Sequence, residues 1–188
     1  QRAVLSDAAA IGVLHADSWR RHYRGAYSDS YLDGDLDTDR MLVWTKRLTH
    51  GGDDTFTLIA KHENKTAGFI HVDLDGDPTW GALVDNLHVG HELQGAGIGT
   101  QLLKVAARMV IARRPGSGLY LWVQEQNTRA QAFYLSRGGT PMGREAVSPP
   151  RGDPGNLAGS PQKIRIVWRE PAVLSRFGPD TQPGRRRH

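Results

Sequence analysis

Apolar and polar positions follow two different periods along this chain, and the period changes about a quarter of the way along it. In the first part, apolar side chains recur at intervals of three and four residues, which predicts amphipathic helices over 8–23 and 36–49. Ser6 or Asp7 is placed to cap the first helix, and a short apolar segment (AVL, 3–5) precedes it as a possible extra strand. The N-terminal part is therefore predicted to be mainly helical.

The middle of the chain has the pattern of strands. Three runs rich in β-branched and aromatic residues, TFTLIAKH (55–62), TAGFIHVDL (66–74) and ALVDNLHV (82–89), are joined by short polar turns, so we expect antiparallel pairing. A helix at 99–113 then leads to a strand at 118–126. Such a crossover favours a parallel neighbour in the sheet.

The last part of the chain adds one helix and two strands. Asn127 can cap a helix over 128–137. The runs TPMGREAV (140–147) and KIRIVWRE (163–170) are typical of strands and flank a Gly/Pro-rich loop.

Together these elements predict an α/β (α+β) fold. We expect a single domain over residues 1–170, with a mixed, mostly antiparallel sheet of about six to seven strands and helices on both faces. Antiparallel pairing changes to parallel pairing between the strands at 82–89 and 118–126. The sheet can splay open there and admit a ligand.

Composition narrows the class of protein. The 188 residues, 38% of them hydrophobic, suffice for one domain with a buried core. We find no apolar run that would span a membrane and no leader-like segment at the start, so we expect a cytoplasmic protein without a membrane partner. The chain has no cysteine, which excludes disulfides and thiol catalysis.

The net charge of +4 is concentrated near the C-terminus. Residues 171–188 hold Arg176 and three arginines at 185–187 against Asp180, so four positive charges minus one give +3 and leave +1 for the rest. We predict a disordered basic tail over 171–188, with polyanion binding as the alternative.

The most unusual stretch is LHVGHELQGAGIGTQLL, where Gly95, Gly97 and Gly99 separate a strand from a helix. Each glycine costs roughly 0.5–1 kcal/mol relative to alanine, so these positions require positive φ angles or close approach of another molecule. The dinucleotide-binding pattern G-x-G-x-x-G is not met, because Thr100 stands where the third glycine is needed. The P-loop pattern is not met either, because Ala96 stands where lysine is needed. A backbone cradle for an anion at a helix N-terminus remains, and a turn with only a packing role is the alternative.

Gln94, Gly97 and Gly99 form a Q-x-x-G-x-G pattern that resembles the pyrophosphate-binding motif of the GCN5-related N-acetyltransferase (GNAT) superfamily. About thirty residues later, NTRAQAFYLSRGG resembles a second pattern of that family through Asn127, Ala130, Phe133, Tyr134 and Gly138. The resemblance extends in element order over roughly residues 3–170. Gly139 departs from it, since the family usually has an aromatic residue there, and this departure predicts looser packing beneath the turn.

The resemblance implies that the loop holds the pyrophosphate of acetyl-coenzyme A, with the pantetheine arm along the preceding strand and no metal. The residues assigned to this cosubstrate are Leu87, His88, Val89, Gln94, Gly95, Ala96, Gly97, Ile98, Gly99, Thr100 and Asn127. The side chain of His88 has the opposite strand parity to Asp85, so we expect it to pack against a helix.

The same resemblance suggests catalytic groups. Tyr134 matches the general acid that protonates the departing thiolate, with a core tyrosine as the alternative. The buried glutamate that serves as the base in some members of the family corresponds to Leu83, so this chain has no base at that position. Asp85 lies on the same face by parity and is the candidate base, or the group that holds the amine, with a structural salt bridge as the alternative.

Trp19, Tyr23, Tyr27 and Tyr31 recur every four residues, and we expect this aromatic stripe to border the acceptor or to belong to the core. The resemblance implies transfer of an acetyl (acyl) group from acetyl-CoA to a primary amine, most simply a small molecule, by direct attack in a ternary complex. A longer acyl-CoA or an aminoacyl-tRNA donor stays open, with phosphate contacts from residues 113–114 and the tail. A non-catalytic CoA-binding module and a homodimer also stay open.

Overall fold

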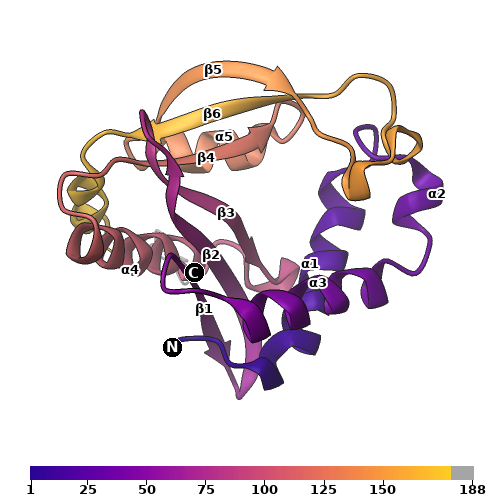
Figure 1. Ribbon diagram of the computed structural model, residues 1–188, viewed down its shortest axis with the longest axis horizontal. Coiled ribbons are helices and arrows are strands. Elements are labelled where there is room, and N and C mark those ends of the chain that lie inside the picture. The colour runs from indigo at the N-terminus through magenta and orange to yellow at the C-terminus, as the bar shows by residue number, and fades with distance from the viewer. Residues whose placement is uncertain (179–188) are drawn as a thin grey trace, which may run out of the picture.

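Six strands form one mixed sheet in the computed structural model, which describes residues 1–178 (Figure 1). The strands, in the sheet order β1-β2-β3-β4-β6-β5, are β1 Thr55–His62, β2 Lys65–Asp77, β3 Gly81–Val89, β4 Leu119–Gln124, β6 Gln162–Trp168 and β5 Thr140–Ala146. The helices are η1 Leu5–Asp7, α1 Ala8–His22, α2 Asp29–Leu32, α3 Leu36–His50, η2 His91–Leu93, α4 Ile98–Arg113, α5 Thr128–Leu135, η3 Pro150–Gly152, η4 Pro154–Asn156 and η5 Pro171–Arg176. The N-terminal segment pairs with β1 only through an isolated antiparallel bridge between Arg2 and Leu58, so it is not a full seventh strand.

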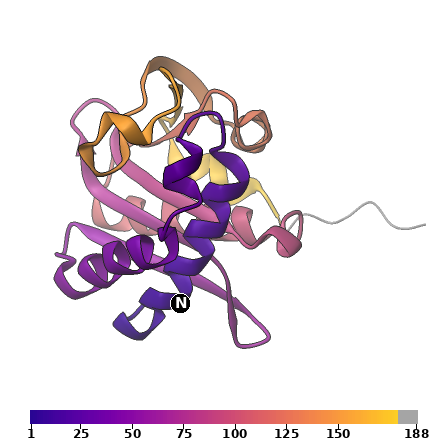
Figure 2. The same ribbon diagram turned by 90° about the vertical axis from the view of Figure 1, so that its right-hand side faces the viewer.

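Helices cover both faces of the strands β1 to β3, with α1 and α3 on one side and α4 on the other (Figure 1, Figure 2). Alternate residues of β2 point to opposite faces: Phe69 clusters with Ile11 and Trp44, whereas Ile70 clusters with Leu103 of α4. Because both faces are buried, this strand needs apolar residues at consecutive positions. The predicted fold class and the helices on both faces are confirmed.

The sheet splays where the sequence predicts it. Strands β3 and β4 pair in parallel at only three positions, which begin at Ala82↔Leu119 and end at Val84↔Leu121. Beyond these pairs, β3 continues to Val89 and β4 to Gln124 without pairing to each other. The two strand ends therefore enclose a wedge.

A β-bulge interrupts β3 at Asp85. The pairing with β2 passes from Val84 to Asn86 and leaves Asp85 unpaired. Asp85 then contacts α3 and His88 contacts α1, so both side chains lie on the same face of the sheet. The prediction of opposite parity is wrong, because a period of two holds only in an unbulged strand. The expectation that His88 packs against a helix is confirmed.

The segment 171–176, assigned from sequence to a disordered tail, instead forms η5 and packs on α4. The side chain of Leu174 is 2% exposed, and Val173 and Phe177 pack against the same core. The Lys104 ammonium donates to the Phe177 carbonyl over 3.3 Å. The domain therefore continues beyond residue 170, and the predicted basic tail at 179–188 lies outside the described residues.

The turn that contains Gly139 is tightly packed rather than loosened. A Cβ atom at Gly139 would lie 2.5 Å from Cγ2 of Ile166 and 2.9 Å from Cζ2 of Trp168. The Trp168 indole also donates to the Arg137 carbonyl over 2.9 Å. An aromatic ring thus reaches this turn from β6, which leaves room only for glycine. Across residues 1–178, no helix has the length and apolarity needed to cross a bilayer.

Candidate active site

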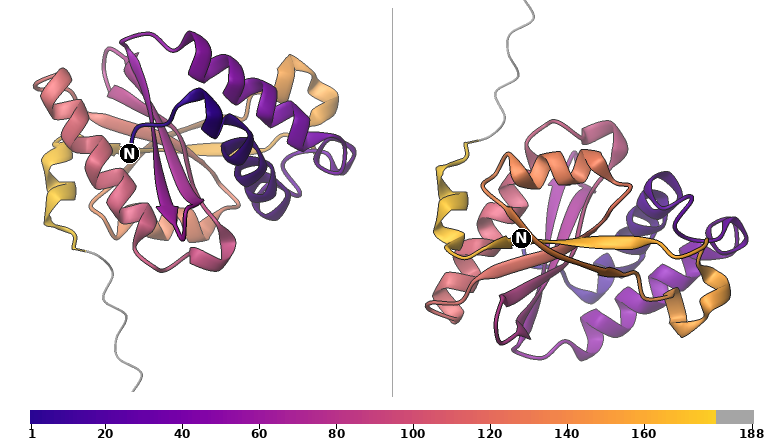
Figure 3. Two further views of the ribbon diagram at one scale, coloured as in Figure 1. Left: turned by 90° about the horizontal axis from the view of Figure 1, so that it is seen from below. Right: turned by 90° about the horizontal axis from the view of Figure 1, so that it is seen from above.

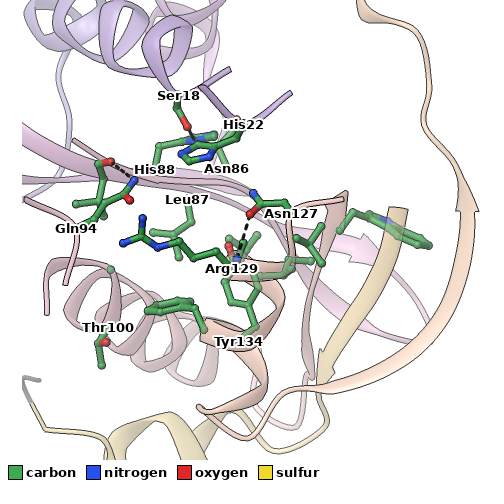
Figure 4. A pocket seen from close by; sticks show the side chains of 18 of the residues that line it. Ser18, His22, Asn86, Leu87, His88, Gln94, Thr100, Asn127, Arg129 and Tyr134 are labelled. Carbon is green, nitrogen blue, oxygen red and sulfur yellow. Dashed lines mark hydrogen bonds between the residues drawn. The ribbon is translucent and has the colours of Figure 1, made fainter. Parts of the chain in front are cut away.

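A cavity of about 300 Å³ opens in the wedge between β3 and β4 (Figure 4). Its walls come from α1, β3, the loop before α4, the start of α4, β4 and α5. The sequence-predicted residues that line it are Tyr23, Asp85, Leu87, His88, Val89, Gln94, Gly95, Gly97, Gly99, Thr100, Asn127 and Tyr134. The other predicted residues, Trp19, Tyr27, Tyr31, Ala96 and Ile98, lie outside the lining.

The glycine loop presents backbone amides to this cavity. Gly95 and Gly97 have φ angles of 87° and 82°, in the left-handed region that favours glycine. A Cβ atom at Gly95 would meet no atom within 4 Å, so this side of the loop is open. Gly97 is the N-cap residue of α4, and the Gln101 N–H donates to its carbonyl over 3.0 Å. The amides at 98–100 therefore precede the first helical bond and can bind an anion.

Gly99 has a different role from the other two glycines. A Cβ atom there would lie 3.3 Å from Cζ of Phe133 on α5, so its missing side chain lets α4 and α5 approach. The close packing of α4 against α5 therefore explains why residue 99 is glycine. Gln94 ties the loop to the preceding strand, because its Nε2 donates to the Val89 carbonyl over 3.4 Å.

Tyr134 projects from α5 into the cavity (Figure 4). Its ring packs edge-on against Phe133 and Trp168, with centroids 5.2 and 6.0 Å away. Burial raises the pKa of the phenol above its usual value, so the hydroxyl keeps its proton at neutral pH. Within residues 1–178 this hydroxyl makes no hydrogen bond and is available as a donor.

Asn127 begins α5 and faces the cavity (Figure 4). Its Oδ1 accepts from the Ala130 N–H over 3.1 Å, which confirms the predicted cap of the helix. The amide NH₂ is not used by this cap and points into the cavity. The residue thus combines a structural role with a donor that has no partner in the described part of the chain.

Asp85 is partly engaged by its neighbours. Its Oδ2 lies 2.7 Å from a guanidinium nitrogen of Arg47 and accepts from the Asn86 amide over 2.6 Å. Both contacts use the same oxygen. In the described part of the chain, Oδ1 has no hydrogen-bond partner.

His88 lies on the cavity wall nearest α1. Its Nδ1 is 2.7 Å from the Ser18 hydroxyl, and its ring packs against His15 and Phe69 at centroid distances of 4.7 and 5.3 Å. Burial first, and then the nearby His22, lowers the pKa of His88 to about 3, so the imidazole is neutral. Helical spacing places Ser18 and His22 on one face of α1, but the sequence does not reveal that this face borders a cavity.

Buried neutral histidines predict acid sensitivity of the fold. Burial lowers the pKa of His71 to about 4, that of His88 to about 3 and that of His15 well below its usual value. The unfolded chain, with histidine pKa values near 6.5, therefore binds more protons between about pH 6.5 and 4. The contribution of these neutral histidines to the free energy of unfolding is fully present above about pH 6.5. It is lost as the pH falls, by at most about 1.4 kcal/mol per pH unit for each histidine.

Urea unfolding at pH 7 and pH 5 checks this expectation. A His88→Gln variant should lose less stability between the two pH values than the unaltered protein. Replacing the exposed His50 in the same way is the control for the loss of a histidine at the surface. Equal pH slopes for the His88 variant and the unaltered protein would show that His88 does not bind protons differently in the two states.

The predicted aromatic stripe is a cluster rather than a helix face. Helix α1 ends at His22, and the chain then turns at Gly25, whose φ is 84°. The rings still meet, at centroid distances of 5.5 Å for Trp19–Tyr23, 5.0 Å for Trp19–Tyr27 and 6.2 Å for Tyr27–Tyr31. These aromatics belong to a small core, and Tyr23 alone among them borders the cavity.

Comparisons with known proteins point to one family. The family model described as the acetyltransferase (GNAT) family matches residues 16–138, which include the cavity-lining elements from α1 to α5. No sequence among curated proteins matches this chain significantly. Matching solved structures include the PaiA N-acetyltransferase from Thermoplasma acidophilum in complex with coenzyme A, at 19% identity, 89% of this chain and 97% of that chain covered, and a TM-score of 0.65.

Two further matching structures are of enzymes whose names include an acceptor. The ribosomal-protein-alanine N-acetyltransferase from Brucella melitensis is 17% identical, with 89% of this chain and 97% of that chain covered and a TM-score of 0.63. Nourseothricin acetyltransferase is 26% identical, with 61% and 65% covered and a TM-score of 0.53. The acceptors named for these proteins differ, although the fold is shared.

Proposed function

This chain belongs to the GNAT acetyltransferase family, and we propose that it transfers an acetyl group from acetyl-CoA to the nitrogen of a primary amine. The observation that carries the proposal is the cavity in the sheet wedge. It combines an open backbone cradle at the N-terminus of α4 with a protonated Tyr134 hydroxyl that has no other partner within residues 1–178.

The residues present fit coenzyme A. The amides after Gly97 suit the pyrophosphate, because they carry the positive end of the α4 dipole. The edge of β3 beyond Val84 is unpaired toward β4, so Leu87 and Val89 offer backbone groups to the amides of the pantetheine arm. The NH₂ of Asn127, which the helix cap does not use, lies near this path. Acetyl-CoA supplies an activated thioester when bound.

Tyr134 is proposed as the general acid. The amine nitrogen attacks the thioester carbonyl carbon, the new C–N bond forms, and the C–S bond breaks. The Tyr134 hydroxyl then gives its proton to the departing sulfur and regains one from solvent. Backbone N–H groups of β3 that face the wedge stabilise the negative charge that develops on the carbonyl oxygen.

Asp85 is proposed as the proton acceptor for the attacking amine, directly or through a water molecule. Arg47 and Asn86 hold Oδ2, while Oδ1 has no partner among residues 1–178, so the carboxylate is oriented and still has an accepting oxygen. Its position on the cavity wall supports this role.

The acceptor is proposed to be a small molecule. The β5–β6 loop closes against the segment after α1, as Figure 3 shows. The Ser28 N–H donates to the Asn156 carbonyl and the Ala158 N–H to the Ala26 carbonyl, both over 2.9 Å. An ion pair between Arg151 and the buried Asp39 fastens the same loop to α3. None of these residues lines the cavity, so the proposal of a small-molecule acceptor is supported by the fold shared with nourseothricin acetyltransferase.

Two measurements test the proposal. Acetyl-CoA should raise the melting temperature, since a ligand at about 100 times its Kd stabilises the folded state by about 2.7 kcal/mol. Thiol release from acetyl-CoA should then depend on one class within a library of primary amines, with intact-mass analysis to detect self-acetylation. Stabilisation without thiol release for any amine would favour a non-catalytic CoA-binding module, and no stabilisation would contradict the proposal.

A further inference from the structure

Arg129 lies in the cavity wall and has no role in the chemistry described above. It is the second residue of α5, and it is the only lysine or arginine among the described residues that line the cavity. Figure 4 shows its side chain extending from α5 into the cavity on the side of Gln94. A cation therefore faces the same space as the glycine loop.

This guanidinium is uncompensated within residues 1–178. Two arginines that line a second, neighbouring pocket together with Arg129 are paired, Arg21 with Asp17 over 2.8 Å and Arg24 with Asp29 over 2.8 Å. Arg129 has no hydrogen bond, ion pair or ring contact in this part of the chain. Its charge acts on His22, whose pKa is lowered by burial and then by Arg129.

Two sources of positive potential thus converge on one end of the cavity. The N-terminus of α4 supplies about half a positive charge, and Arg129 supplies a full one. Among the described residues of the lining, Asp85 provides the single carboxylate, and Arg47 holds it on the other side of the wedge. This end of the cavity is suited to a ligand with more than one negative charge.

We propose that Arg129 binds a phosphate group of coenzyme A, opposite the backbone amides of the glycine loop, and so selects CoA thioesters over thioesters without phosphate. The inference rests on the proposed function. A guanidinium can donate two parallel hydrogen bonds to a phosphate, and its exposed side chain is free to adjust to the ligand. The pyrophosphate and the 3′-phosphate of CoA share this chemistry.

Isothermal titration calorimetry with Arg129→Gln tests the proposal without any acceptor. The Kd for CoA should rise by about 10- to 100-fold, the size expected for loss of a hydrogen bond between charged groups. Pantetheine, titrated to millimolar concentrations, should bind both proteins alike. Arg129→Lys should recover part of the affinity, and the salt dependence of CoA binding should become shallower in Arg129→Gln.

Dephospho-CoA distinguishes the two phosphate sources. If Arg129 binds the pyrophosphate, Arg129→Gln should weaken the binding of dephospho-CoA as much as the binding of CoA. If Arg129 binds the 3′-phosphate, the loss should disappear with dephospho-CoA. Arg108→Gln is the charge-matched control, because Arg108 is exposed on α4 and lies outside the cavity lining.

An unchanged Kd for CoA in Arg129→Gln would overturn the inference and leave the proposed function intact. If Arg108→Gln weakened CoA binding equally, net charge would explain the effect and the inference would be overturned. If Arg129→Gln weakened pantetheine binding equally, local packing would explain the effect and the inference would again be overturned. A failure of CoA to bind the unaltered protein would instead contradict the proposed function.

Discussion

Replacing Tyr134 with phenylalanine is expected to lower kcat by about 10²–10⁴-fold, the usual contribution of general acid catalysis, while changing the Kd for CoA little. The hydroxyl acts only as the thiolate leaves, so its loss should not affect binding before that step. The ring contacts with Phe133 and Trp168 remain in the variant, and the fold should be preserved. Steady-state kinetics and calorimetry on the same preparation measure both quantities.

The matched control is Tyr120→Phe, because Tyr120 is also a buried tyrosine but lies outside the cavity lining. An Asp85→Asn variant gives a second comparison. If Asp85 accepts the proton of the amine, the activity of that variant should recover in part as rising pH deprotonates the amine, whereas the Tyr134→Phe defect should persist. An unaltered kcat in Tyr134→Phe, measured where chemistry limits turnover, would identify Tyr134 as a packing residue only.

Replacing Gly97 with valine is expected to abolish the thermal stabilisation by CoA. The φ angle of Gly97 is 82°, which costs a side-chain-bearing residue about 1–2 kcal/mol, and valine would also crowd the amides at the start of α4. The folded protein should therefore melt somewhat earlier and should no longer respond to CoA. Differential scanning fluorimetry across a CoA titration measures both effects.

Gly116→Val separates the two effects. Gly116 has a φ angle of 81°, and a Cβ atom there meets nothing within 4 Å, so the strain is similar but the cavity is untouched. This control should lose comparable stability and keep its full CoA response. A Gly97→Val protein that folds and still shows the normal CoA shift would contradict the assignment of the glycine loop to the pyrophosphate.

The sequence by itself determined most of the helices and strands and the position of the glycine loop. The strand predicted at 55–62 is β1, and the helix predicted at 99–113 differs from α4 by one residue. These features are local, since they depend on the period of apolar positions and on backbone angles that glycine tolerates. The splay was predictable for a related reason, because a crossover helix returns the chain in the same direction and so changes the pairing from antiparallel to parallel.

Only the tertiary structure decided how the site is completed. The bulge at Asp85 turns its side chain toward Arg47, and Trp168 fills the turn at Gly139 from a strand about thirty residues away. Packing of η5 on α4 likewise depends on contacts between segments far apart in sequence. The lack of a partner for Arg129 within residues 1–178 has the same origin, because the fold decides which distant side chains come within reach of a charge.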